Sequence, residues 1–341
     1  MKVRISSIPM MFEYLSKLNT EPADIVLVNE LFNHEDYQFE IRRYGLSSIE
    51  HLVFYFSRLK SIKEEEIPDL SDERKNALRD KHNLWLDCVS NPQKYYKRYE
   101  KVKHILCEEN IQNLQHRLSV AFPNDIVIND ANIISTLSFG SSFGYVYENA
   151  LHLDLFGIEE ICTIQELLYV ILHEMHHLQI QKLIGDYYSF TKRFSLLENY
   201  IFRFTGEGLA IKFCNNAEGV VSKRIDNNLD INIGIPAMSI LNHHFEEHLS
   251  LFNDTIKKIK QKSITESEID EQFRSYWWNP YLYKNEMAVL SQTPIYSFGN
   301  EIFGCIFDVF GMEIMFECFY NPIKTIEYFN KTNCGYMISK V

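Results

Sequence analysis

One short stretch of the chain concentrates side chains that could do chemistry. The segment HEMHH (173–177) holds three histidines and one glutamate, and it directly follows the apolar run QELLYVIL (165–172). Residues four apart in an α-helix lie on one face, one turn from each other. His173 and His177 are therefore expected to project side by side, at a separation that suits two imidazoles on one tetrahedral metal ion.

Glu174 is placed to act beside such an ion without binding it. In a helix it is rotated about 100° from His173, so its carboxylate can reach a water near the metal and serve as a general base. The HExxH pattern thus puts two ligands and one base on a single rigid element. Since a buried helix does not carry such polar groups without a use for them, we favour a metal site over surface histidines. His176 faces away from the pair, and we expect it to support the site or lie at the surface.

Local signals predict the helix that carries this motif. Thr163 and Glu166 form a T-x-x-E capping box, which starts a helix at about Ile164. Gly185 is a natural stop. The predicted helix therefore spans 164–184, with HEMHH in its second half.

The same letters contain a rival pattern. Glu174 and His177 also form E-x-x-H, the spacing of carboxylate sites that bind two irons, but such a site needs a second E-x-x-H on another helix. None of the other histidines among the 12 in the chain has a glutamate three positions before it. The sequence therefore favours a mononuclear site with one Zn²⁺ per chain.

A mononuclear catalytic zinc needs a third protein ligand and an open position. The segment LLENYIFRFTGEGLAIKF (196–213) offers two carboxylates, Glu198 and Glu207. Both lie far enough beyond His177 to allow a connection and a return helix. Glu207 stands in GEGLA, whose glycines allow the backbone to approach a neighbouring helix closely. Spacing alone does not choose between the two carboxylates.

At this point the chain resembles a known family. HEMHH followed by EGLA resembles the gluzincin-type zinc metallopeptidases, and it is similar to bacterial zinc-dependent peptidases that share an HExxH…EGLA pattern. The resemblance covers roughly residues 125–330. It implies that Glu207 is the third ligand. It also implies a zincin-like fold, because the β-block that ends in NALHLDL (149–155) resembles the strands that precede the active-site helix in these enzymes. In them the edge strand lines the cleft and can bind a peptide by β-addition.

The resemblance also points to a group that stabilises the oxyanion. Gluzincins place a Tyr or His opposite the zinc, because negative charge builds on the carbonyl oxygen in the transition state. The segment YSFGNEIFGCIFDVFG (296–311) resembles a Tyr-x-x-Gly helix start found near the end of these families. We therefore prefer Tyr296. The other candidates are His243, His244 and Tyr283.

Three further features have both a structural and a functional interpretation. NHHFEEH (242–248) has two histidines four apart, but the order is wrong for HExxH, and an exposed polar helix face is favoured over a second metal site. YWWNPYLYKNE (276–286) concentrates aromatic residues, and a packed loop is favoured over a hydrophobic specificity pocket. His152 and Asp154, near the end of a predicted strand, are candidates to orient a ligand histidine.

The remaining patterns predict a mostly helical α+β protein. Within residues 1–118, SSIEHLVFYFSRL (47–59) is a helix with Ser47 as its N-cap, and 93–118 is one long helix. A further helix is predicted to follow Ser71.

A block rich in β-branched residues interrupts the helices. Residues 125–156 predict a small β-sheet of two to four strands that precedes the active-site helix, with a turn at GSSFG (140–144). Helical patterns then resume to the end. We predict an N-terminal helical region (1–118) and a zincin-like catalytic domain (119–341), or one continuous unit.

Composition excludes several classes. The 341 residues carry a net charge of -12, which argues against binding to nucleic acid or to an anionic membrane surface. No apolar run is long enough to cross a membrane, and the first residues lack the pattern of a signal peptide. The seven cysteines include no CxxC pair, so we expect reduced thiols in a cytoplasmic protein.

Together these features predict a zinc metallopeptidase whose substrate is a peptide or a protein. Two alternatives stay open. The first is a zinc-binding regulatory or interaction protein that keeps the fold without catalysis, and the second is a zinc hydrolase that acts on a small molecule. Nothing in the sequence specifies the oligomeric state.

Overall fold

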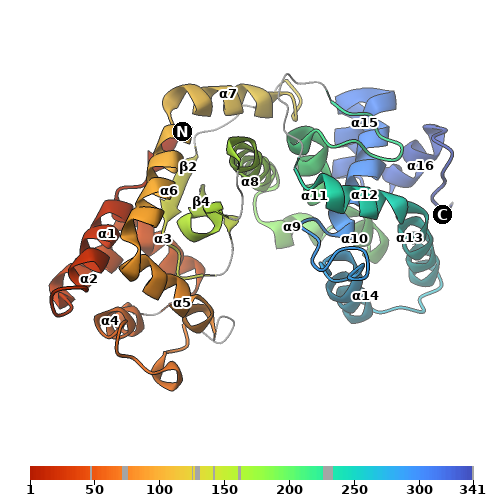
Figure 1. Ribbon diagram of the computed structural model, residues 1–341. Helices are drawn as coiled ribbons and strands as arrows, with labels where there is room; N and C mark the ends of the chain where they lie inside the picture. Colours follow the sequence, from red (N-terminus) through yellow and green to blue (C-terminus); the bar gives the residue numbers. More distant parts are fainter. Residues whose placement is uncertain are drawn as a thin grey trace. The chain divides into compact units, whose positions relative to one another are not determined.

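The computed structural model describes residues 1–46, 48–70, 76–124, 126, 131–140, 143–159, 163–225 and 233–339 (Figure 1). The protein is mostly helical (63%) and has a small mixed sheet of four strands, which confirms the predicted α+β class. Contacts divide the chain into two compact units, one of residues 1–113 and 129–167, the other of residues 114–128 and 168–341. The predicted division at residue 118 into a helical region and a catalytic domain stays a prediction.

The first unit contains the sheet. Its strands lie in the order β1-β2-β4-β3, where β1 and β4 run parallel to β2 and β3 runs antiparallel to β4. The strands are β1 (Lys2–Arg4), β2 (Asn132–Thr136), β3 (Gly144–Tyr147) and β4 (Ala150–Asp154). Three of them lie within 125–156, as predicted, and the predicted GSSFG turn falls partly outside the described residues. β1 was not predicted, because a strand of three residues is too short to show alternation.

The helices of the first unit pack against this sheet and against one another. They are α1 (Ser7–Lys17), α2 (Ile25–Asn33), α3 (Glu35–Arg43), α4 (Glu50–Ser57), α5 (Ala77–Ser90) and α6 (Pro92–Ile105), with the short η1 (Glu64–Glu66) and η2 (Leu155–Glu159). Phe39 on α3 packs against Ile134 and Tyr145 of the sheet. The predicted N-cap Ser47 and the predicted helix start after Ser71 lie outside the described residues.

The prediction of one long helix over 93–118 is wrong. The segment forms α6 and a separate α7 (Glu108–Ser119). The Asn110 side chain donates a hydrogen bond to the carbonyl oxygen of Ile105 (3.0 Å), which satisfies a group at the end of α6. Glu108 and Glu109 occupy the first turn of α7, where the helix dipole favours negative charge.

Among its described residues, the second unit contains helices and loops but no strand, and it also includes the last part of α7. Its helices are the larger part of α8 (Ile164–Ile184), then α9 (Tyr187–Thr191), α10 (Leu196–Phe202), α11 (Thr205–Ala210), η3 (Ile211–Asn215), α12 (Ile235–His243), α13 (Phe245–Lys260), α14 (Glu266–Gln272), η4 (Phe273–Trp277), α15 (Pro294–Tyr320) and α16 (Lys324–Lys331). Figure 1 shows α11 and α12 beside α15, against which both pack. The helical backbone of α15 is interrupted at Gly311, where φ is 82°. No helix in the described ranges is both long and apolar enough to cross a membrane.

The predicted boundaries of α8 are confirmed. The backbone N–H of Thr163 donates to the Glu166 carboxylate (2.8 Å), and the backbone N–H of Glu166 donates to the Thr163 hydroxyl (3.1 Å). These two bonds satisfy donors at the helix start that have no partner inside the helix. Gly185 follows the last turn with a φ of 68°, a left-handed conformation that glycine adopts without steric cost.

Two glycines let α11 and α15 approach each other closely. A Cβ atom added to Gly208 would lie 2.6 Å from the Cα of Gly299, and one added to Gly299 would lie 2.8 Å from the Cα of Gly208. Real Cβ atoms do not come this close to other atoms, so both positions require glycine. Gly206 differs, because a Cβ atom there would meet nothing within 4 Å. The close approach predicted from GEGLA therefore occurs at Gly208 alone.

This contact predicts that Gly208→Ala destabilises the protein. The added methyl group must push α11 away from α15, and overpacking of this kind costs about 1–3 kcal/mol. Gly206→Ala is the matched control two residues away. It should leave stability unchanged or raise it by up to about 1 kcal/mol, because alanine favours a helix over glycine. Chemical denaturation of both variants measures the difference, and equal midpoints would contradict the role of the glycine contact.

Candidate metal centre

Three side chains from two helices converge in the second unit. The Nε2 atoms of His173 and His177, both on α8, lie 2.8 Å apart. Oε2 of Glu207, on α11, lies 3.0 Å from His173 Nε2 and 3.1 Å from His177 Nε2. In the part of the chain that the structure describes, this is the group of three His, Cys, Asp or Glu side chains close enough to share a metal ion.

The donor atoms fit a mononuclear zinc site. Two imidazole nitrogens and one carboxylate oxygen form a set found in catalytic zinc enzymes, with metal–ligand distances of about 2.0–2.2 Å. Ligands of a tetrahedral ion at those distances are about 3.4 Å apart. The three atoms, now 2.8, 3.0 and 3.1 Å apart, would need to separate by about 0.3–0.6 Å. His177 and Glu207 also border a cavity, which gives access to a fourth position.

The negative charge of Glu207 is balanced by a positive charge on His177. Burial alone would lower the pKa of His177, but the charge of Glu207 and its hydrogen bond raise that pKa to about 9. Burial would raise the pKa of Glu207, but the charge of His177 and hydrogen bonds from both histidines lower it. Without a metal, the carboxylate therefore holds a proton on His177. A metal cation would replace that proton, since only a neutral imidazole binds metal.

The structure separates the two candidate carboxylates. Glu198 lies in the first turn of α10, where it accepts hydrogen bonds from the backbone N–H (2.8 Å) and the hydroxyl (2.7 Å) of Ser195. This capping box uses the Glu198 carboxylate to start the helix. Glu207 is the carboxylate beside the two histidines.

Glu174 lies on α8 outside the three-atom group. Its negative charge contributes to the raised pKa of His177 and to that of Tyr296. The Glu174 carboxylate is therefore close to the proposed ligand His177 and to the tyrosine. It is half-buried, as a base that must meet substrate and water should be.

Tyr296 also lies at this site, in the first turn of α15. Its ring centroid is 6.0 Å from that of His173. Burial, together with the charges of Glu207 and Glu174, raises the pKa of Tyr296 well above its usual value. The hydroxyl thus keeps its proton at neutral pH and can donate a hydrogen bond.

Sequence reasoning missed Tyr169. Its hydroxyl lies 3.2 Å from Nδ1 of His173, and its side chain is buried. Burial raises the pKa of this hydroxyl, and the neighbouring Gln292 side chain opposes that shift. A partner on the second ring nitrogen holds the orientation and the tautomer of a ligand histidine. The spacing was the available signal, because Tyr169, His173 and His177 follow one another at intervals of four.

His176 is a buried neighbour of the group. Its ring stacks on Phe122, with centroids 5.0 Å apart. Burial, with the charges of His177 and His173, lowers the pKa of His176 well below its usual value, so the ring stays neutral. The surface position considered for His176 is therefore wrong.

His152 and Asp154 make their polar contacts inside the first unit. Nε2 of His152 lies 3.0 Å from the Glu40 carboxylate, and Asp154 forms a buried ion pair with Lys81. The proposal that either residue orients a ligand histidine of the second unit stays a prediction. The orienting contact to His173 that the described residues provide comes from Tyr169.

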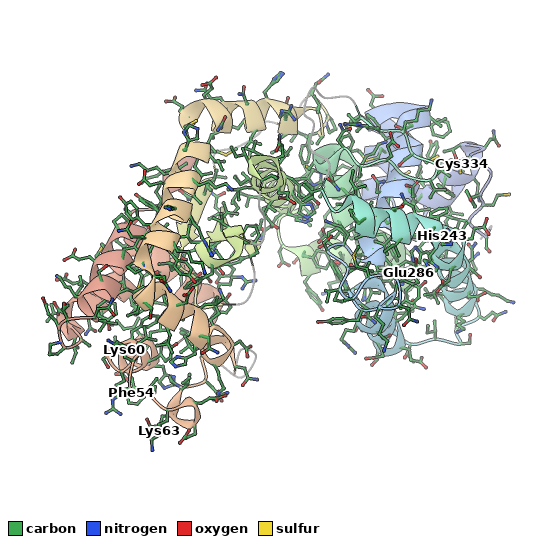
Figure 2. All side chains as sticks on the ribbon, in the orientation of Figure 1. Phe54, Lys60, Lys63, His243, Glu286 and Cys334 are labelled. Atoms are coloured by element: carbon green, nitrogen blue, oxygen red, sulfur yellow. The ribbon has the colours of Figure 1, made fainter. Side chains whose placement is uncertain are left out.

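The other candidates for the oxyanion group lie in a separate cluster. His243 is exposed at the end of α12, where Figure 2 labels it. The ring of His244 stacks on Tyr283 with centroids 3.9 Å apart, and its Nε2 lies 2.6 Å from the Glu286 carboxylate. His248 is fully buried on α13, so the predicted exposed polar face is wrong at that residue. It lies on the side of α13 that packs into the core.

Comparison with known proteins adds one finding. A family model with the description "Putative zinc dependent peptidase (DUF5700)" matches residues 28–333. No curated protein and no solved structure matches the chain.

The geometry predicts which glutamate the metal needs. Glu207→Ala should lose bound zinc, because it removes one of three ligand atoms. Glu198→Ala, the matched control, should keep its zinc and lose only about 1 kcal/mol of stability with its capping box. Elemental analysis of the purified variants measures zinc per chain. Loss of zinc in Glu198→Ala with retention in Glu207→Ala would reverse the assignment.

The pKa of His177 predicts how metal affinity depends on pH. Below about pH 9 the metal must displace a proton from His177, so the affinity should fall by about tenfold for each pH unit between 8.5 and 7. An unperturbed histidine, with a pKa of about 6.5, would give little change over that interval. Competition with a chelator of known pH dependence measures the slope. Glu207→Gln removes the charge that raises the pKa, so its weaker binding should show a flatter slope.

Proposed function

Because the chain belongs to the DUF5700 family, described as a putative zinc dependent peptidase, we propose that it hydrolyses peptide bonds by gluzincin-type chemistry. The observation that carries this proposal is the convergence of His173, His177 and Glu207, with Glu174 on the same helix as the two histidines. The substrate is a peptide or a protein.

His173, His177 and Glu207 would hold one zinc ion. When bound, this ion supplies positive charge that polarises a carbonyl group and acidifies water toward neutral pH. Tyr169 fixes the ring of His173 through Nδ1, which leaves Nε2 directed at Glu207 and His177. His173 is buried, whereas His177 and Glu207 are half-buried and border the cavity, so water and substrate can reach the centre.

Glu174 acts as the general base. It follows His173 on α8, and its charge contributes to the raised pKa values of His177 and Tyr296. It therefore lies at the edge of the same site. Its carboxylate accepts a proton from the attacking water and then delivers that proton to the leaving amine. A glutamate beside the ligands can do this without occupying a ligand position.

Tyr296 acts on the carbonyl oxygen. Negative charge builds on that oxygen as the water attacks, and a donor placed in advance stabilises it. The raised pKa of Tyr296 keeps its hydroxyl protonated, as a donor requires. Packing against Trp278, with ring centroids 5.8 Å apart, supports the position of the tyrosine ring.

The mechanism predicts that Glu174→Gln separates metal binding from hydrolysis. The variant should keep its zinc, because the three ligand atoms remain, but lose about 10²- to 10⁴-fold in rate with the base removed. Peptide-library cleavage read by mass spectrometry, together with elemental analysis, measures both. Glu246→Gln, an exposed glutamate on α13, is the matched control and should behave as wild type.

Three outcomes would reject the proposal. Equal hydrolysis by wild type and Glu174→Gln would remove the base from the mechanism. A zinc-loaded wild type that cleaves no peptide would favour a binding protein on this fold. Activity confined to small esters or amides would favour a small-molecule hydrolase.

A further inference from the structure

A cavity of about 450 Å³ opens beside the proposed metal centre, within the second unit. His177 and Glu207 form part of its wall, so the cavity and the centre share two side chains. Its volume lies in the range of about 300–1,000 Å³ that is usual for sites that bind organic molecules. The cavity is thus large enough for a bulky side chain and lies where a bound substrate would place one.

One wall continues the helix face that carries His177. Ile180 and Ile184 follow His177 at intervals of three and four residues, so they extend the same face toward the end of α8. Both are apolar. The face of α8 that carries the proposed ligand His177 is therefore apolar over the next two turns of the helix.

Three aromatic residues, Tyr187, Phe202 and Trp278, also line the cavity. Tyr187 and Phe202 lie with ring centroids 6.1 Å apart, and Tyr187 is 54% exposed, so its ring is available to a ligand. Trp278, 42% exposed, borders the cavity and also packs edge-on against Tyr296. Trp278 therefore connects the cavity wall to the proposed oxyanion donor. The aromatic segment 276–286, for which a packed loop was favoured, supplies both the buried Trp277 and this cavity residue.

The charged groups at the cavity already have partners. Arg203 pairs with Asp270 (2.6 Å), and its guanidinium lies over the ring of Phe273. Asp186 accepts a hydrogen bond from the backbone N–H of Ser189 (2.7 Å) as the N-cap of α9. These pairings remove the need for a charged ligand. The rest of the wall is mostly apolar, with Gln181 and Thr205 as its uncharged polar residues.

Gly206 contributes open space to the cavity. It lies in the wall directly before Glu207, and a Cβ atom there would meet nothing within 4 Å. Its backbone φ is not in the left-handed region, so no conformational constraint requires glycine. Close packing does not require it either, in contrast to Gly208. The missing side chain leaves space for a ligand.

We propose that this cavity binds the side chain of a substrate residue next to the scissile bond, that it selects a bulky apolar and preferably aromatic side chain, and that Gly206 determines this specificity. The inference rests on the proposed peptidase function, because it takes the metal centre as the place of bond cleavage. It adds the class of substrate, which the ligand set alone does not define.

The test uses acetyl-(Ala)4-X-(Ala)4-amide peptides in which X is Phe, Leu, Ala or Asp. For the zinc-loaded wild type, kcat/KM should be at least about tenfold higher for X = Phe than for X = Ala, with cleavage at a bond of residue X. Gly206→Leu fills the cavity and should abolish this preference while zinc per chain stays the same. Trp278→Ala should also weaken the preference. Tyr281→Ala, an exposed aromatic residue three positions on, is the matched control and should not.

A binding measurement separates this inference from the proposed function. In the Glu174→Gln background, calorimetry should show tighter binding of the Phe peptide than of the Ala peptide, and adding Gly206→Leu should remove the difference. A wild type that cleaves nothing while this difference persists would reject the peptidase but support the cavity. Cleavage without preference for Phe, or a preference that Gly206→Leu leaves intact, would overturn the cavity proposal. Equal binding of the two peptides would overturn it as well.

Discussion

The contact between Gly208 and Gly299 is the constraint on which the candidate centre depends. It brings the backbones of α11 and α15 together without an intervening side chain. Glu207 is the neighbour of Gly208, and Tyr296 lies one turn before Gly299 on α15. One backbone contact thus sets the positions of a proposed ligand and a proposed oxyanion donor together. The proposed ligand and the proposed donor are thus positioned by a contact between two glycines.

The second organising feature is a buried charge that needs a cation. Glu207 sits beside two imidazoles, where burial disfavours its charge unless a positive group is near. In the metal-free protein the proton on His177 supplies that charge, and the same geometry suits a metal ion. The cavity beside the centre differs in character. Apart from His177 and Glu207, its charged residues Arg203 and Asp186 have partners elsewhere, and most of its remaining wall is apolar. Charge is concentrated where bond cleavage is proposed, and apolar surface where a side chain would bind.

Local signals predicted the parts of the structure that depend on neighbours in sequence. The capping box at Thr163 and the stop at Gly185 located α8, and the block 125–156 located three of the strands. The predictions were wrong or incomplete where contacts between residues distant in sequence determine the secondary structure or the burial of a side chain. The break between α6 and α7 has only a weak local signal. β1 is a strand because it pairs with β2, and the helices α1 to α7 separate the two strands in the sequence. His248 lies in a polar-looking segment, yet the packing of α13 buries it.

The sequence by itself determined the helical pair of His173 and His177, with Glu174 beside them, because helical periodicity relates residues four apart without reference to the rest of the chain. It also narrowed the third carboxylate to Glu198 or Glu207. Only the tertiary structure placed Glu207 beside the histidines, since that depends on how α11 packs between distant segments. The same holds for Tyr296 and for the cavity at Gly206, whose neighbours come from α8, α10 and the loop after η4. Spacing in one helix is a local property, whereas convergence of several helices is decided by packing.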